Sequence, residues 1–217
     1  ETILAFKQVV SQGIRVILQG SGSHNAHALS EAVSRHNARD PEHSVLYLNF
    51  GAIDTALTNE KCSFWHFRFD ANMDMKLAAM TTYMATQKKI RNVYLINQDY
   101  GAGQTASRVG KEMLAIKRPD ISIAGDELHP IGKIIDFAPY ISKIKASEAD
   151  AVISNNWGPD LSLLIKSAAE AGLQATFYTN YAYLKGTPSV IRKAGDGRVK
   201  TVLSWHINIV GDPLVPF

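Results

Sequence analysis

A loop rich in glycine and serine, Gly20-Ser-Gly-Ser-His-Asn-Ala-His27, follows a short apolar run and precedes a segment with helical periodicity. Such a strand-to-helix corner is a common anion site, because the first N–H groups and the positive end of the helix dipole face the loop. The hydroxyl groups of Ser21 and Ser23 add hydrogen-bond donors, and Ser23 is also predicted to cap the helix. The loop therefore predicts an anion-binding corner.

A nucleotide is the first anion to consider at this loop. Gly20 and Gly22 match the first two glycines of G-x-G-x-x-G, but Asn25 stands at the third position. The next predicted strand ends at Asn49 rather than at an acidic residue that could bind a ribose, and the sequence contains no G-x-x-x-x-G-K-[ST] motif. The pattern argues against a nucleotide and favours a small carboxylate.

Patterns for catalysis and metal binding are weak. The serine loop lacks the spacing of a G-x-S-x-G nucleophile elbow, and no carboxylate pair has an acid/base arrangement. His24 and His27 are interpreted as solvated helix residues, since no third metal ligand is near them, and His66 and His129 as structural residues. We therefore predict a binding protein with no catalytic residue, metal or cofactor. An enzyme on a flavodoxin-like sheet remains an alternative.

Charge and cysteine content exclude other classes of protein. The net charge is only +3, and the densest basic run, at 88–91, ends a predicted helix without a basic or aromatic stripe, so no nucleic acid is expected. Cys62 is the single cysteine, which excludes an internal disulfide. No apolar run approaches the roughly 18–20 residues that span a membrane. Neither end reads as a finished element, so we expect a piece of a longer protein.

Short β-branched runs alternate with helical periods along the chain. Strands are predicted at 15–18, 45–48, 93–96, 121–124, 151–153, 176–178 and 199–203. This alternation indicates parallel sheets with helices on both faces. The extended aromatic stretch Phe64–Phe69 suits a chain that passes from one sheet to another. We therefore divide the chain into a partial first lobe at 1–70, a second lobe at 71–198, and a segment at 199–217 that returns toward the first.

Every conspicuous polar loop lies at the carboxyl end of a predicted strand, where ligands of parallel sheets bind. Asp54 follows the second strand and is suited to an ammonium group. Tyr100, Trp157 and Tyr181 follow three strands of the second lobe, where aromatic rings could cover an apolar ligand. The loops together predict a cleft with polar anchors on one wall and aromatic residues on the other.

A series of motifs then recurs in a familiar order. It comprises Lys7-Gln through Gly13-Ile-Arg-Val16, the serine loop, Phe50-Gly-Ala52, Asn97-Gln-Asp-Tyr-Gly101, Asp136-Phe-Ala-Pro-Tyr140 and Ala149-Asp-Ala-Val152. Over nearly its whole length the chain resembles the type I periplasmic solute-binding proteins of the branched-chain amino-acid ABC transporters. The resemblance implies a Venus-flytrap fold of two doubly wound parallel α/β lobes, with the first lobe incomplete here. It also implies a periplasmic location, a monomer, and delivery of a small ligand to a membrane permease.

The resemblance also implies a ligand site, with two departures from the family pattern. The serine loop would hold a carboxylate, the Gly-Ala loop would hold an ammonium group, and second-lobe residues would complete the cleft. Ile53 stands where a hydroxyl residue is expected, and Tyr181 where an acidic residue is expected. The ligand is therefore either an amino acid, with Asp54 as the replacement acid, or an aliphatic or aromatic acid without an amine. The predicted contacts are Ser21, Ser23, Gly51, Ala52, Ile53, Asp54, Tyr100, Asn155, Trp157 and Tyr181. A ligand-sensing domain of a receptor or regulator is the second alternative.

Overall fold

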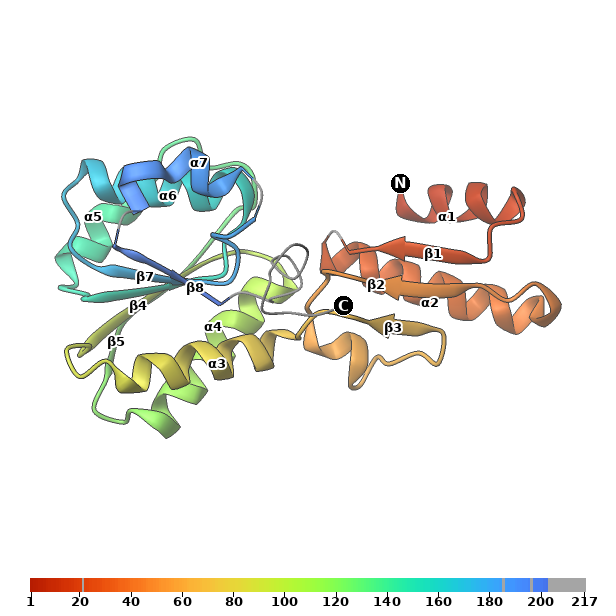
Figure 1. Ribbon diagram of the computed structural model, residues 1–217, viewed down its shortest axis with the longest axis horizontal. Helices are drawn as coiled ribbons and strands as arrows, with labels where there is room; N and C mark the ends of the chain where they lie inside the picture. The colour runs from red at the N-terminus through yellow and green to blue at the C-terminus, as the bar shows by residue number, and fades with distance from the viewer. Residues whose placement is uncertain (21, 185, 196, 203–217) are drawn as a thin grey trace, which may run out of the picture. The chain divides into compact units, whose positions relative to one another are not determined.

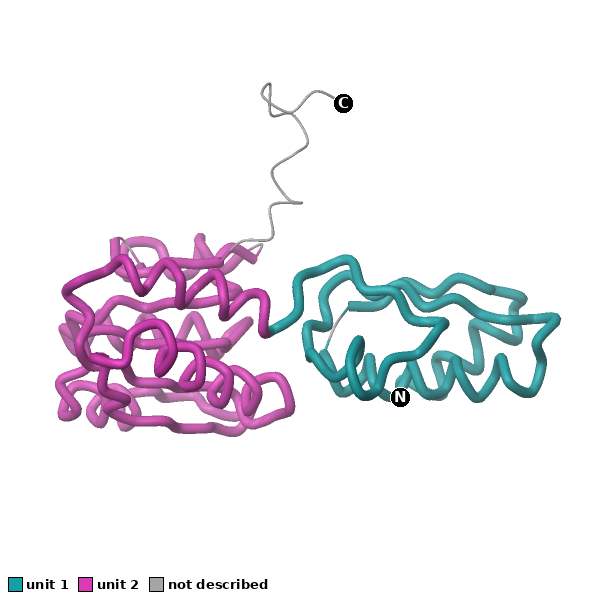
Figure 2. The backbone as a smooth tube through the Cα atoms, turned by 90° about the horizontal axis from the view of Figure 1, so that it is seen from below, with its two compact units in different colours: residues 1–73 teal, residues 74–217 magenta. Residues whose placement is uncertain are grey.

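The computed structural model describes residues 1–20, 22–184, 186–195 and 197–202. The chain divides into two compact units, residues 1–73 and 74–217 (Figure 2). The predicted contact Ser21 and most of the predicted returning segment, 199–217, lie outside the described residues. The start of that segment, 199–201, is a strand of the second unit.

The first unit contains a three-stranded parallel sheet in the order β1-β2-β3. Its elements in chain order are α1 (Thr2–Ser11), β1 (Val16–Gln19), α2 (Ser23–Arg39), η1 (Pro41–His43), β2 (Leu46–Asn49), η2 (Thr55–Thr58) and β3 (His66–Arg68). In register, Ile17, Tyr47 and His66 form one row across the sheet. Together with Val45 and Leu57, this face packs against Phe6 of α1 and Leu29 and Val33 of α2.

The second unit contains a five-stranded parallel sheet in the order β5-β4-β6-β7-β8 (Figure 1). Its elements are α3 (Met73–Thr86), β4 (Asn92–Gln98), α4 (Gly101–Lys117), β5 (Ser122–His129), α5 (Ala138–Ala146), β6 (Ala151–Ser154), α6 (Gly158–Glu170), β7 (Thr176–Thr179), α7 (Thr187–Ile191), η3 (Arg192–Gly195) and β8 (Val199–Thr201). The helices α5, α6 and α7 lie over one face of the sheet, and α3 and α4 lie over the other (Figure 1).

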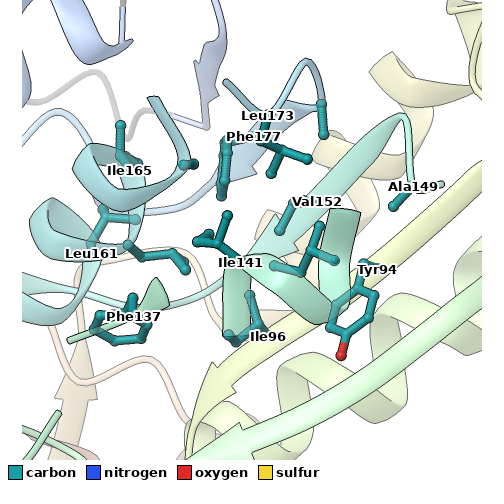
Figure 3. Packing of buried hydrophobic residues seen from close by; sticks show 14 of the residues in the cluster. Tyr94, Ile96, Phe137, Ile141, Ala149, Val152, Leu161, Ile165, Leu173 and Phe177 are labelled. Carbon is teal, nitrogen blue, oxygen red and sulfur yellow. The ribbon is translucent and has the colours of Figure 1, made fainter. Parts of the chain in front are cut away.

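The core of the second unit is a continuous apolar layer between the sheet and its helices. Ile141 of α5 and Leu161 and Ile165 of α6 point toward Val152 and Phe177 of the sheet (Figure 3). Because the strands are buried on both faces, they read in the sequence as unbroken apolar runs rather than as alternating ones. This second sheet is the rigid base for the loops at its carboxyl edge.

The structure confirms the predicted α/β fold with parallel sheets. Each predicted strand is present within a few residues of its predicted place, and the aromatic stretch at 64–69 contains β3, which joins the first sheet before the chain enters the second unit. Among the described residues, the helices are too short or too polar to cross a membrane.

Candidate ligand-binding site

The strand order of the second unit creates a switch point between β4 and β6. The chain leaves β4 toward β5 on one side, and β6 lies on the other side. In open α/β sheets, ligands bind beyond the carboxyl ends of the strands at such a point. The residues that follow these two strands, Asp99-Tyr100 and Asn155-Asn-Trp157, therefore mark the most favourable place for a site on this unit.

Two aromatic residues occupy the N-cap positions of the helices at this switch point. Tyr100 precedes α4 and Trp157 precedes α6, both with extended backbone and neither with a side-chain bond to its helix. N-caps strongly favour Ser, Thr, Asp or Asn, whose oxygens accept from the first helical N–H groups. Instead, the indole Nε1 of Trp157 donates to the hydroxyl of Tyr100 at 3.2 Å. At these two positions, aromatic residues replace the usual capping residues, and their side chains are hydrogen-bonded to each other. We call Tyr100 and Trp157 the aromatic pair.

Buried amides fix the backbone beneath this aromatic pair. The side-chain oxygen of Asn97 accepts from the backbone N–H of Asn155 at 2.7 Å, and Asn97 donates to Ser107 at 2.9 Å. The side-chain oxygen of Asn155 in turn accepts from Asn180, which follows β7. Because these residues are almost wholly buried, the network links the ends of β4, β6 and β7 into one rigid edge.

A buried carboxylate holds the aromatic pair from the side of α6. Asp160, in the first turn of α6, is 2% exposed. It accepts from the side chain of Gln98 at 2.7 Å and from the backbone N–H of Gly132 at 2.8 Å. Gln98 also reaches the carbonyl of Trp157 at 3.4 Å. The position in the first turn favours the negative charge through the helix dipole, so Asp160 joins β4, α6 and the loop after β5.

His129 supports the same edge from β5. Its Nε2 lies 2.8 Å from the side-chain nitrogen of Asn156, and its Nδ1 lies 3.3 Å from the carbonyl of Pro130. The ring is fully buried and meets Phe137 edge-on, as expected of a structural histidine.

Several buried polar atoms at this edge have no hydrogen-bond partner among the described residues. They include the side-chain nitrogen of Asn155, the side-chain oxygens of Asn156 and Gln98, and the hydroxyl of Thr179. A buried polar group without a partner costs about 1–3 kcal/mol, and such groups are rare in folded proteins. Their concentration at the ends of β4, β6 and β7 therefore singles out this edge from the rest of the unit.

Tyr181 is placed differently from the aromatic pair. It follows β7, is half-buried, and packs against the apolar core of the second unit. The structure therefore places Tyr100, Asn155 and Trp157 at the switch point, and Tyr181 one strand further along the same edge.

In the first unit, the loops after β1 and β2 approach each other closely. A Cβ atom on Gly20 would lie 2.6 Å from the backbone nitrogen of Gly51, so glycine is required by contact rather than by backbone angle. The side-chain oxygen of Asn49 accepts from the N–H groups of Gly51 and Ala52 and so shapes this second loop. The predicted contacts Gly51 and Ala52 thus lie beside the serine loop.

The predicted contacts Ile53 and Ala52 are less available than the sequence indicates. The side chain of Ile53 is buried, and its carbonyl accepts from the backbone N–H of Met73 at 2.9 Å. The carbonyl of Ala52 accepts from the side chain of Asn49. Each carbonyl keeps one further lone pair, so a ligand would share these oxygens with the protein.

Two predictions about the serine loop are wrong. Ser23 is the first helical residue and Gly22 is the N-cap, so the Ser23 hydroxyl accepts from the backbone N–H of Asp54 at 3.3 Å instead of capping α2. His27 is not a solvated helix residue, because its Nε2 lies 2.9 Å from the Asp54 carboxylate. His24 is exposed, as predicted.

Asp54 is already used within the first unit. One carboxylate oxygen lies against His27, and the other accepts from the backbone N–H of Ala56, which caps η2. The backbone carbonyl of Asp54 accepts from Arg68 at 2.9 Å. Asp54 therefore ties the loop after β2 to α2, a role that the sequence did not reveal.

Sequence reasoning missed the residues that support the two loops. His27, Asn97 and Asp160 each fix a predicted contact or its neighbour. The signal in the sequence that could have identified them is their position, because each is a polar residue in or near a loop that follows a buried strand. Among the described residues, no group of three metal-ligating side chains is present.

The chain is similar to known binding proteins. The family described as "Periplasmic binding protein" matches residues 2–208. A Leu/Ile/Val-binding protein homolog of Brucella abortus is 36% identical over 176 residues, which cover 81% of this chain and 42% of that protein. The chain thus spans less than half the length of this curated relative.

Solved structures show the same likeness. A leucine-, isoleucine-, valine-, threonine- and alanine-binding protein of Brucella ovis, in a closed conformation, superimposes with a TM-score of 0.81 at 33% identity, over 89% of this chain and 49% of that one. A solute-binding protein of an R. palustris ABC transporter, in complex with benzoate, superimposes with a TM-score of 0.78 at 18% identity, over 90% of this chain and 51% of that one. At that identity the second likeness concerns the fold alone. By sequence and by structure, the chain belongs to the periplasmic binding protein family.

Proposed function

We propose that the protein containing this chain is the solute-binding component of an ABC importer. It would capture a small carboxylate ligand in the periplasm, as a monomer and without chemical turnover, and deliver it to a membrane permease. The observation that carries this proposal is the aromatic pair Tyr100–Trp157 at the switch point of the second sheet, in a chain that belongs to the periplasmic binding proteins.

The first unit supplies the anion anchor in this proposal. The Ser23 hydroxyl accepts from Asp54, which leaves its hydrogen for donation to a carboxylate. The first N–H groups of α2 have no partner within the helix and carry its positive dipole end. Ser21, which belongs to this loop in the sequence, and Gly51 and Ala52, which lie beside the loop, are proposed as further contacts.

The second unit supplies the body of the site. Trp157 and Tyr100 would cover the apolar part of the ligand, and Asn155 and Tyr181 are proposed as further contacts of this unit. A ligand shifts the equilibrium between the open and the closed protein only through contacts that are better in the closed form. Aromatic faces meet this requirement, since they gain most when water is excluded.

A thermal-shift screen of the full-length protein tests this function. Branched-chain amino acids, aliphatic acids and aromatic acids are each added at increasing concentration. A ligand that binds only the folded protein stabilises it by mass action and so raises its melting temperature. At a free ligand concentration of about 100 times Kd, the free energy of unfolding rises by about 2.7 kcal/mol. Trp157→Ala should abolish the shift, Trp157→Phe should weaken it, and the exposed Phe64→Ala should leave it unchanged.

Two outcomes would contradict the proposal. One is a complete absence of stabilisation by all three ligand classes, and the other is chemical conversion of a bound ligand. Delivery is tested separately, by adding the loaded protein to its reconstituted permease, whose ATP hydrolysis should rise. A receptor or regulator would bind the ligand without this effect.

A further inference from the structure

The carboxylates at the carboxyl edge of the second sheet are all used by the fold or lie in water. Asp160 is buried but accepts from Gln98 and Gly132. Asp136 is exposed and accepts from the first turn of α5, and Asp99 is exposed and accepts from Gln104. Among the described residues that follow β4 to β7, none offers a buried carboxylate that is not already bound.

Among the described residues that follow the strands of the first unit, the acidic residues Asp54 and Asp70 already have partners, and Asp70 accepts from the backbone N–H of Ala71 at 2.8 Å. Asp54 lies against His27 at 2.9 Å and accepts from Ala56, so both its oxygens have partners. Its side chain is 14% exposed, and a ligand cation would have to compete with the histidine for it. The one acidic residue of the loop after β2 is therefore committed to the protein.

The second unit is also unfavourable to a cation because of its helices. The N-termini of α4 and α6, at Gly101 and Gly158, both lie at the carboxyl edge of the sheet and flank the switch point. Each carries about half a positive elementary charge. Asp160 offsets the field of α6 only, and α4 has no acidic residue in its first turn.

Among the described residues, the buried polar atoms without a partner at this edge are uncharged. They include the side-chain nitrogen of Asn155, the side-chain oxygens of Asn156 and Gln98, and the hydroxyl of Thr179. Such atoms can bond a hydroxyl, a carbonyl or water, but they cannot neutralise a desolvated ammonium ion, which is costly to bury unless it is paired. The same edge also carries the aromatic pair, and Tyr181 lies one strand further along it.

From these four observations we infer that the ligand is a carboxylate that carries no α-ammonium group, with an aliphatic or aromatic body. This inference rests on the proposed function and specifies its ligand class. The sequence leaves two ligand classes open, amino acids and acids without an amine, and the inference favours the acids.

Matched ligand pairs test the inference on the full-length protein by isothermal titration calorimetry. L-Leucine is compared with 4-methylpentanoate, and L-phenylalanine with 3-phenylpropanoate, because each pair differs only in the α-ammonium group. Benzoate and 4-hydroxybenzoate are added as acids whose ring is attached directly to the carboxylate. We expect at least one acid to bind, and to bind at least tenfold more tightly than the amino acid of its pair.

The outcomes separate the inference from the proposed function. If either amino acid binds as tightly as its deaminated partner or more tightly, the inference is overturned while solute capture stands. If none of the six compounds binds, both are overturned. Preference for the acids supports both.

A variant tests the electrostatic reason directly. Tyr181→Glu places a carboxylate at the half-buried end of β7, and Tyr183→Glu places the same charge two residues further on as the matched control. Tyr181→Glu should reduce the preference for acids over amino acids by tenfold or more, and Tyr183→Glu should not. An unchanged preference in a folded Tyr181→Glu protein, judged by its far-UV circular dichroism, would overturn the charge argument.

Discussion

The two units contain parallel sheets whose faces are covered to very different extents. In the second unit, the central strands β4, β6 and β7 are buried along nearly their whole length. In the first unit, one face of the sheet packs against α1 and α2. Val16, Leu18 and Phe67 belong to the opposite face and are exposed in the part of the chain that the structure describes.

This difference shows that similar apolar strands contribute differently to stability. A parallel sheet is normally buried on both faces, and burial stabilises in proportion to the apolar area removed from water. β1 and β4 read alike in the sequence, yet alternate residues of β1 contribute little to the core of its unit. In this 217-residue chain, which spans less than half of its curated relative, we therefore expect the second unit to be the more stable of the two.

The carboxyl edges of the two sheets also share a device. In each unit a buried histidine lies near an asparagine side chain and a backbone carbonyl: His66 with Asn49 and Leu57, and His129 with Asn156 and Pro130. Both asparagines shape or adjoin the loops in which we place the ligand. The supporting chemistry is thus similar in the two units, while the burial around it differs.

The largest expected effect concerns the centre of the second sheet. Leu95 in β4 is 0% exposed, and Leu95→Ala should destabilise the second unit by about 2–5 kcal/mol, through lost burial and the cavity left behind. Hydrogen exchange of β4 and β6, measured by mass spectrometry, reports on that unit alone. Exchange in these strands that stays as slow as in the unchanged protein would contradict the expected covering of both faces.

A smaller effect is expected where α4 approaches β4. A Cβ atom on Gly103 would lie 1.9 Å from the carbonyl oxygen of Gln98, so Gly103→Ala must move the helix or the strand end. Overpacking of this kind costs about 1–3 kcal/mol. The matched control is Gly110→Ala in the same helix, where the Cβ atom would meet only Leu95 at 3.3 Å.

Gly103→Ala should also weaken ligand binding, because Gln98 supports the backbone of Trp157. Calorimetry against the tightest acid would measure this loss. If Gly103→Ala and Gly110→Ala behave alike in both stability and binding, the close approach of α4 has no special role.

Much of the fold could be predicted because it depends on local pattern. The buried strands of the second unit are unbroken apolar runs, and Pro159 and Gly172 mark the two ends of α6. Tyr100 and Trp157 could be proposed as contacts because their strands have parallel neighbours. That their side chains bond to each other depends on the strand order, which no local pattern contains.

The support of the site could not be predicted for the same reason. The pairing of His27 with Asp54 joins residues 27 positions apart, and that of Asn97 with Asn155 joins residues 58 positions apart. A histidine in a polar helix start resembles any solvated histidine until the facing loop is placed. Ser23 resembles an N-cap for the same reason, although its hydroxyl is bound by a loop 31 residues away.

A third expected effect is a dependence of the first unit's stability on pH. Burial lowers the pKa of His66 below its usual value of 6.5, because desolvation disfavours the charged ring; the contact with the Leu57 carbonyl opposes this shift, and the positive charge of Arg68 adds to it. The unfolded chain therefore binds more protons than the folded chain at pH values below about 6.5. The neutral His66 ring therefore makes its full contribution to the stability of the folded unit above about pH 6.5. This contribution is lost as the pH falls from about 6.5 toward the lowered pKa of the folded state.

Hydrogen exchange of β2 and β3 at pH 7.5 and pH 5.5, corrected for the intrinsic exchange rate, would measure this loss. His66→Gln removes the titrating group and should reduce the difference between the two pH values. An equal difference in both proteins would assign the acid sensitivity to other groups.

The smallest expected effect is the sharpest test of the comparison between the two sheets. Leu18 in β1 is 67% exposed, and in this 217-residue chain Leu18→Ala should change the stability of the first unit by no more than about 0.5 kcal/mol. The substitution is chemically identical to Leu95→Ala, so any difference between the two variants reflects the covering of the sheet faces and not the side chain. Hydrogen exchange of β1 and β2 provides the measurement. Destabilisation as large as that caused by Leu95→Ala would mean that the exposed face of the first sheet is covered in solution.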